Sequence, residues 1–291
     1  MLGVLGHAAI DVIRKEGMSW KSPGGAPTYC SFYLKQVSVD VMPISIVGRD
    51  FITYIKDYEE RKIPTQRIKV VDGYSTTSYE ITYFSDGSRK LRLLSRCRDF
   101  MIEDLYDLPD AIAVNPIARE LNLDLLKHIR RQVSFLGVDI QGFTRVFDDQ
   151  GYVSISTSID YITEIIKNAD LVKMSIDDVQ IEHINAIANK FPNKVLVLTM
   201  GVRGSILIHD SKKFMVSTNN IVNAVDTTGA GDVLTCTLTH MLSKGEDKVW
   251  SFIYSNAVAV AKTTGRGPYG TIDKHLVALI ADKLMSRLTQ A

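Results

Sequence analysis

The sequence is poor in cysteine, in excess charge and in long hydrophobic runs. Its 291 residues include three widely spaced cysteines, Cys30, Cys97 and Cys236, that form no CxxC pair. This favours reduced thiols in the cytoplasm over a disulfide framework or a zinc site. The formal net charge of +1 gives no broad basic surface for a nucleic acid. No apolar run approaches the roughly 20 residues of a membrane span, and the apolar first residues lack the basic leader of a signal peptide. We therefore expect a cytoplasmic protein without nucleic-acid or membrane partners.

Two common nucleotide-binding motifs are also missing. The chain contains no GxxxxGK[ST] loop, and its histidines form no HExxH metal motif. A dinucleotide fingerprint is incomplete, because Gly229-Ala230-Gly231 is not followed by a third glycine. The stretch about 20 positions further on, residues 251–256, has no carboxylate to hold a ribose. An NAD-dependent oxidoreductase is therefore the weaker of two enzyme hypotheses.

Short apolar, β-branched runs alternate with longer segments of helical period along most of the chain. The expected strands are 111–114, 135–139, 171–174 and 195–199, and the expected helices are 121–132, 159–168 and 179–190. This alternation is typical of an α/β fold with a mostly parallel sheet. No repeat, low-complexity tract or long linker interrupts it, so we expect a single domain over residues 1–291.

Residues 76–94 break this alternation and predict a strand, a turn and a second strand. One face of the first strand would carry Thr77, Tyr79, Ile81 and Tyr83. Residues 85–88 (SDGS) supply the turn. Such a hairpin either decorates the edge of a sheet or forms a lid that covers a substrate and excludes water. The pattern alone leaves both open.

The most informative stretch is residues 226–232 (DTTGAGD). Residues 230–242 have helical period, and Gly245 lies where a left-handed cap is expected. Small residues at a helix start leave N–H groups open to an anion, and the helix dipole adds positive charge. The carboxylate of Asp232 could accept the proton of an attacking hydroxyl while these amides hold a phosphoryl group. The alternative is that Asp232 only complements the dipole and that the glycines only allow close packing.

Residues 226–232 resemble the signature of the ribokinase, or phosphofructokinase-B-like, family of sugar and nucleoside kinases. Other family motifs are matched in order by residues 6–11 (GHAAID), 24–27 (GGAP), 48–50 (GRD), 199–204 (TMGVRG) and by Asn256. The hairpin matches the family's β-lid. The resemblance implies a ribokinase-like three-layer α/β domain with a mostly parallel sheet and a small lid, whose strands we expect at about residues 11–22 and 70–96.

The resemblance also implies roles for single residues. Asp232 would be the catalytic base, with the amides of Gly229, Ala230 and Gly231 as the anion hole. The acceptor would be bound by Asp11, Gly24, Gly25, Asn115 and Gln141. ATP would be contacted by Thr199, Gly201, Gly204, Thr228 and Asn256, with Mg²⁺ bridging its phosphates. Taken singly, an asparagine on an apolar helix, such as Asn256, is usually a packed amide with satisfied partners.

Departures from the family pattern bear on the metal and the acceptor. Many members carry Asn-x-x-Glu where this chain has residues 175–178 (SIDD), which leaves Asp178 as the candidate magnesium residue. Ala9 and Tyr29 stand where ribokinases commonly have sugar-binding asparagines, which argues against ribose. Residues 139–145 (DIQGFTR) resemble inositol-kinase-like members, so myo-inositol is the first candidate acceptor. Another sugar, a nucleoside, a non-catalytic binding protein and a homodimer through the lid stay open.

Overall fold

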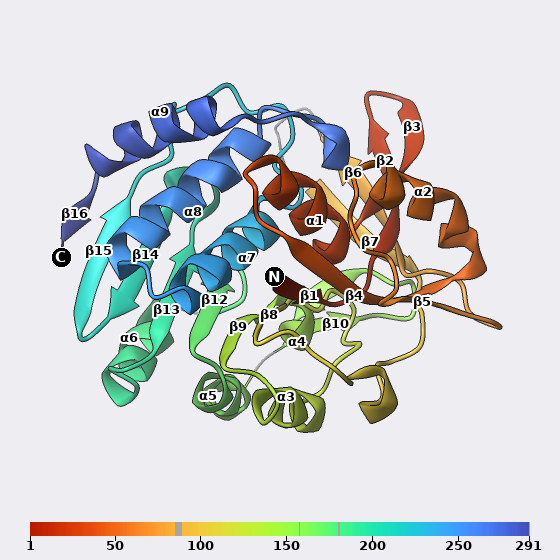
Figure 1. Ribbon diagram of the computed structural model, residues 1–291, viewed down its shortest axis with the longest axis horizontal. Coiled ribbons are helices and arrows are strands. Elements are labelled where there is room, and N and C mark those ends of the chain that lie inside the picture. Colours follow the sequence, from red (N-terminus) through yellow and green to blue (C-terminus); the bar gives the residue numbers. More distant parts are fainter. Residues whose placement is uncertain (85–88, 157, 180, 291) are drawn as a thin grey trace.

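The computed structural model describes residues 1–84, 89–156, 158–179 and 181–290; the expected turn at 85–88 lies outside them. Within this part of the chain the main sheet has ten strands in the order β16-β15-β14-β13-β12-β9-β8-β1-β4-β5 (Figure 1). Their bounds are β1 (Leu2–Leu5), β4 (Val41–Gly48), β5 (Ile68–Val71), β8 (Ala111–Val114), β9 (Phe135–Asp139), β12 (Leu171–Ser175), β13 (Val195–Thr199), β14 (Ser205–His209), β15 (Lys212–Val216) and β16 (Thr289–Gln290).

The main sheet is mostly parallel, as expected. Neighbouring strands from β5 to β13 run parallel, and β14, β15 and β16 extend one edge antiparallel. The predicted strands β8, β9 and β13 are confirmed at both ends, and β12 runs one residue longer than expected. These strands are readable from the sequence because both faces of a parallel sheet are buried, which demands continuous apolar runs.

Helices cover both faces of this sheet (Figure 1). One face carries α1 (Ala26–Gln36), α7 (Ala230–Ser243), α8 (Lys248–Lys262) and α9 (Lys274–Met285), and the other α3 (Leu123–Arg130), α5 (Ile159–Asn168) and α6 (Ile181–Lys190). The prediction of α5 is confirmed in full. The helix α3 begins two residues later than expected because the side chain of Asn122 caps it, accepting from Leu125 N at 2.9 Å. Among the described residues, no helix is long and apolar enough to span a membrane.

The helices α1 and α7 pack against each other on one face of the sheet. Cys30 of α1 and Cys236 of α7 meet there, buried, with their Sγ atoms 2.7 Å apart. The short helix α2 (Ile52–Glu60) packs beside α1, where the rings of Tyr58 and Phe32 lie 4.8 Å apart. Chain segments that lie far apart in sequence therefore meet around α1 and α7.

A second, four-stranded sheet forms the lid, in the order β3-β2-β6-β7. Its strands are β2 (Ala9–Lys15), β3 (Met18–Gly24), β6 (Ser78–Tyr83) and β7 (Arg89–Ser95). They lie at the right of Figure 1, beside α1 and α2. Tyr79 and Ile81 share one face, as expected, and are buried against Ile117 and Ala118 in the loop after β8. Residues 70 and 71, which we expected in the lid, belong to β5.

A short ribbon extends the lid on the side of β7. The helix α4 (Gln141–Thr144) leads into β10 (Arg145–Phe147), which pairs antiparallel with β11 (Val153–Ile155). Leu93 N of β7 donates to Gly151 O at 2.7 Å, and Lys90 Nζ lies 3.8 Å from the centre of the Tyr152 ring. The sequence carries no separate signal for this ribbon because its strands are three residues long.

Candidate active site

The carboxyl ends of three neighbouring strands open into one cavity of about 800 Å³. Asp139, Ser175 and Thr199 end β9, β12 and β13, and all three line it. The amino end of α7, residues 229–232, lines the same cavity. Ligands of open α/β sheets bind at this edge of the sheet, so the cavity is the candidate site.

Gly229 caps α7 in a conformation that favours glycine. Its φ is 77°, and a Cβ built on it would lie 2.3 Å from Cγ of Tyr29. A Cβ on Gly231 would lie 3.3 Å from Nζ of Lys173, so a buried ammonium stands beside the helix start. The amide of Ala230 donates to Thr227 O at 3.2 Å and is therefore engaged in the turn. Helix dipole, backbone amides and Lys173 together make this place favourable for an anion.

Asp232 lies in the first turn of α7 and faces Asn115, whose Nδ2 donates to its Oδ1 at 3.2 Å. Burial raises the pKa of Asp232 to about 6, and the negative charge of Asp139 adds to the rise. Oδ1 of Asn115 is buried and has no hydrogen-bond partner in the described part of the chain. A buried amide oxygen needs a donor, and a polyol bound beside Asp232 would supply one from a hydroxyl other than the one that hydrogen-bonds to Asp232.

Asp11 lies on the lid strand β2 and is not among the residues that line the cavity. Its side chain is buried against Gly24, where a Cβ would lie 2.1 Å from Oδ2 of Asp11, so only glycine allows this approach. Burial raises the pKa of Asp11 to about 7, and Asp232 is among the negative charges that add to it. Gly25, with φ of 77°, caps α1, and its Cβ would clash with His7 O at 2.2 Å.

The profile of the pfkB family carbohydrate kinases matches residues 1–275. The chain belongs to this family. It is a carbohydrate kinase, a phosphotransferase that acts on a hydroxyl acceptor. This assignment sets aside the dinucleotide-dependent oxidoreductase and confirms the resemblance carried by residues 226–232.

Relatives of this carbohydrate kinase span nearly its full length. A Pyrococcus horikoshii protein assigned as a sugar kinase is 28% identical over 295 residues, which cover 93% of this chain and 92% of that protein. A pyrophosphate-dependent kinase in the ribokinase family, solved with a pyrophosphate analog and myo-inositol, matches with a TM-score of 0.76 at 22% identity, over 92% of this chain and 97% of its own. A Vibrio cholerae fructokinase, solved with fructose, ADP and potassium ion, matches with a TM-score of 0.76 at 17% identity, over 96% and 98%. At these identities the solved structures establish the ribokinase-like fold.

The residues expected to contact ATP fall into two groups. The cavity of this kinase is lined by Thr199, Gly201, Gly204 and Asn256. Thr228 is instead hydrogen-bonded to the hydroxyl of the lid residue Tyr83. The amide of Asn256 is satisfied by protein partners, since it accepts from Ser205 Oγ at 2.7 Å and donates to Phe252 O at 2.8 Å. Asn256 is therefore a packed amide with satisfied partners, and it also lines the cavity.

The segment around Asp178 forms a buried charge cluster. Oδ2 of Asp178 accepts from Ser175 N at 2.9 Å, and burial raises its pKa against the opposing charge of Lys173. Lys173 Nζ lies 3.1 Å from Oδ2 of Asp139, whose Oδ1 accepts from Gln141 N at 3.0 Å. No group of three or more metal-binding side chains is found within the described ranges.

Two residues of the kinase site have no role that the sequence alone assigns. Lys173 has no motif of its own, because it is a lysine inside an apolar strand. Asp226 opens the signature, and the structure gives it a structural role. Its Oδ1 accepts from Thr228 N at 2.9 Å and from Tyr83 OH at 3.4 Å, and its Oδ2 accepts from Gly267 N at 2.7 Å. Asp226 therefore fixes the loop before α7 and joins it to the lid.

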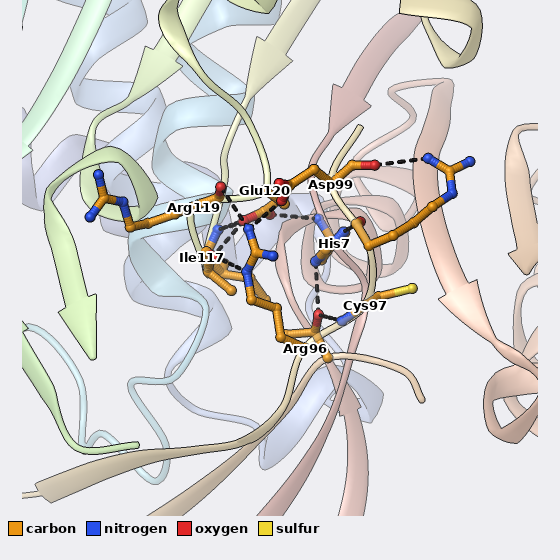
Figure 2. Close-up of polar contacts among 10 residues, drawn as sticks. His7, Arg96, Cys97, Asp99, Ile117, Arg119 and Glu120 are labelled. Carbon is orange, nitrogen blue, oxygen red and sulfur yellow. Dashed lines mark hydrogen bonds and ion pairs between the residues drawn. The ribbon is translucent and has the colours of Figure 1, made fainter. Parts of the chain in front are cut away.

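Glu120 connects the start of the lid strand β2 to the loop that follows β8 (Figure 2). Its buried carboxylate accepts from the backbone of His7, Ile117 and Ala118 at 2.7–3.0 Å. His7 donates from Nε2 to Arg98 O at 3.0 Å and accepts at Nδ1 from Thr77. Glu120 thus ties the entry to β2 to the loop that presents Asn115, and nothing in the sequence pattern marks it.

The raised pKa of Asp11 predicts a pH-dependent gain in stability when it is neutralised. Between its ordinary value of 3.8 and about 7, the folded state holds a proton that the unfolded chain has lost, so Asp11 destabilises the fold increasingly as pH rises. At pH 8, Asp11→Asn should raise the free energy of unfolding by about 1–3 kcal/mol, because it removes a buried charge. At pH 4 the gain should nearly vanish.

Chemical denaturation at both pH values checks this prediction. The exposed Asp282→Asn, in α9, is the matched control and should change stability at neither pH. An Asp11→Asn variant that is no more stable than wild type at pH 8 would contradict it.

Proposed function

We propose that the protein transfers the γ-phosphoryl group of ATP to a hydroxyl of a cyclic polyol such as myo-inositol. The observation that carries the proposal is the pairing of Asp232 with Asn115, because it places a carboxylate of raised pKa beside an unpartnered buried acceptor at a helix start. A sugar or nucleoside acceptor is the alternative within the same chemistry.

The proposed roles follow from this geometry. The hydroxyl that reacts donates to Asp232, and a neighbouring hydroxyl of the same acceptor donates to Oδ1 of Asn115. Asp11 and Gly24 hold the acceptor from the lid side. Asp232 takes the hydroxyl proton as the oxygen attacks, a contribution of about 10²–10⁴-fold for a general base. The amino end of α7, with Gly229, Gly231 and Lys173, stabilises the charge of the group in transfer.

The shape of the cavity supports a nucleotide donor. Besides the start of α7, its lining includes small apolar side chains: Val222, Ala224, Ala259 and Val260. A pyrophosphate has no group that would fill this part, whereas an adenine base would. ATP would supply the phosphoryl group and Mg²⁺ would neutralise its phosphates. Asp178 fits only as a partner of the metal's water, because its carboxylate already accepts from Ser175 N and faces Lys173.

The proposal is tested by supplying Mg²⁺ with either ATP or pyrophosphate and a panel of myo-inositol, fructose, glucose, ribose and inosine. We expect ADP release from ATP, fastest with myo-inositol. Transfer from pyrophosphate but not from ATP would contradict the donor. Faster transfer to another member of the panel would identify a different acceptor. It would leave the assignments of the base and of the anion site unchanged.

We also propose that the protein forms a homodimer through the edge of the lid sheet. β3 forms one edge of the described lid sheet, and an edge strand can pair with a second copy. Light scattering of the purified protein, with a mass twice that of the chain expected, decides this point.

A further inference from the structure

Lys262, the last residue of α8, is a lysine with no exposed surface. Its Nζ donates to Asp226 O at 3.0 Å and lies 3.9 Å from Oδ2 of the same residue. Burial lowers the pKa of Lys262 to about 8, and the charge of Asp226 opposes a further fall, so the ammonium keeps its proton at neutral pH. Burying a cation is strongly unfavourable without such partners. The position of Lys262 therefore needs a structural or functional explanation.

Two aromatic rings form the other wall around this ammonium. Nζ lies 5.2 Å from the centre of the Tyr29 ring and 5.7 Å from that of Tyr33, within the range of cation–π attraction. Tyr29 is also the ring against which Gly229 packs before α7. One side chain therefore touches both the ammonium and the cap of the candidate catalytic helix.

The ammonium also lies where two loops are joined. Val225 N and Asp226 N both donate to Thr263 O, the residue after Lys262, at 2.7 and 3.1 Å. The Asp226 carboxylate binds Gly267 N on one side and Thr228 N on the other. Without a cation, this carboxylate would remain buried with its charge opposed only by hydrogen bonds, and the loop could shift to reach water.

We infer that Lys262 is a positioning residue, a built-in cation beneath the loop of residues 226–229 that fixes the anion-binding end of α7. Its ammonium holds the Asp226 carbonyl and compensates the Asp226 carboxylate, so that Gly229 and Gly231 face the group in transfer. Lys262 contacts neither acceptor nor donor. The inference rests on the proposed role of this helix end.

The first test replaces Lys262 with methionine, which keeps most of the length of the side chain and removes its charge. We expect kcat to fall about 100-fold, the cost of misplacing reacting groups by about 1 Å, with the KM for acceptor nearly unchanged. The matched control is Lys248→Met at the other end of α8, where a half-buried lysine pairs with Asp210 at 3.1 Å. It should leave kcat and KM at wild-type values.

The second test is chemical rescue of Lys262→Ala. Ammonium or methylammonium ions should raise the kcat of this variant at least tenfold, whereas tetramethylammonium, too large for the space, should not. Unchanged kcat in Lys262→Met overturns the inference. So does a loss of kcat that only follows the unfolded fraction, measured by thermal melting, and that no small cation restores. Wild-type kcat in Asp232→Asn would instead show that the proposed function is at fault.

Discussion

Asp232→Asn lowers kcat by about 10²–10⁴-fold and leaves the Kd for nucleotide within about threefold of wild type. The amide keeps the size of the side chain and its place in the first turn of α7, and its oxygen can still accept from Asn115. It cannot take a proton from the acceptor hydroxyl. The loss should therefore fall on the chemical step, which single-turnover kinetics with saturating donor and acceptor measures.

The competing explanation of Asp232 is a charge that complements the helix dipole. Asp124 offers the matched control because it is an exposed aspartate in the first turn of α3. Asp124→Asn removes the same dipole contact, worth about 0.3–1 kcal/mol of stability, and should not change kcat. Wild-type kcat in Asp232→Asn, with stability lowered as in Asp124→Asn, would leave only the dipole role.

Gly229→Ala should lower kcat by about 100-fold, and it should also destabilise the protein. Its φ of 77° is unfavourable for alanine, and the new Cβ would lie 2.3 Å from the Tyr29 ring. Either the ring or the loop must move, and both define where the helix end meets the cavity. Steady-state kinetics with thermal melting separates the loss of activity from the loss of fold.

Gly245 provides the control for backbone strain. It follows the other end of α7 with φ of 78°, and a Cβ there would meet no atom within 4 Å. Gly245→Ala should therefore lower stability by about 1–2 kcal/mol and keep wild-type kcat. Equal kinetics in the two variants would mean that the packing of Gly229 on Tyr29 does not position the site.

The parts of the fold that could be predicted from the sequence share one physical property. The buried strands β8, β9 and β13 and the helix α5 have a strong local pattern, because each must present apolar side chains at a fixed period. The ribbon of β10 and β11 and the edge strand β16 were missed, since strands of two or three residues have no period to detect. The lid's bounds shifted because its strands are partly exposed, which weakens the apolar pattern at their ends.

For the candidate site, sequence motifs located the groups at the ends of strands and helices. Asp11, Asn115 and Asp232 are far apart in the chain. The fold brings Asn115 into hydrogen-bond contact with Asp232, and it places Asp11 where the charge of Asp232 raises its pKa. No local sequence pattern marks Lys173, Lys262 or Glu120, because each is a charged residue whose partners come from other elements. Their burial becomes visible only once those elements are packed.

The most direct test of this account is the pH dependence of kcat/KM for the acceptor, measured at saturating donor for wild type, Asp11→Asn and Asp232→Asn. Because the pKa of Asp232 is raised to about 6, the base loses its function as pH falls, and kcat/KM should drop about tenfold per pH unit below that value. We predict this rising limb in wild type and in Asp11→Asn, and a flat, low residual rate in Asp232→Asn. The same limb in Asp232→Asn would contradict the assignment of the base.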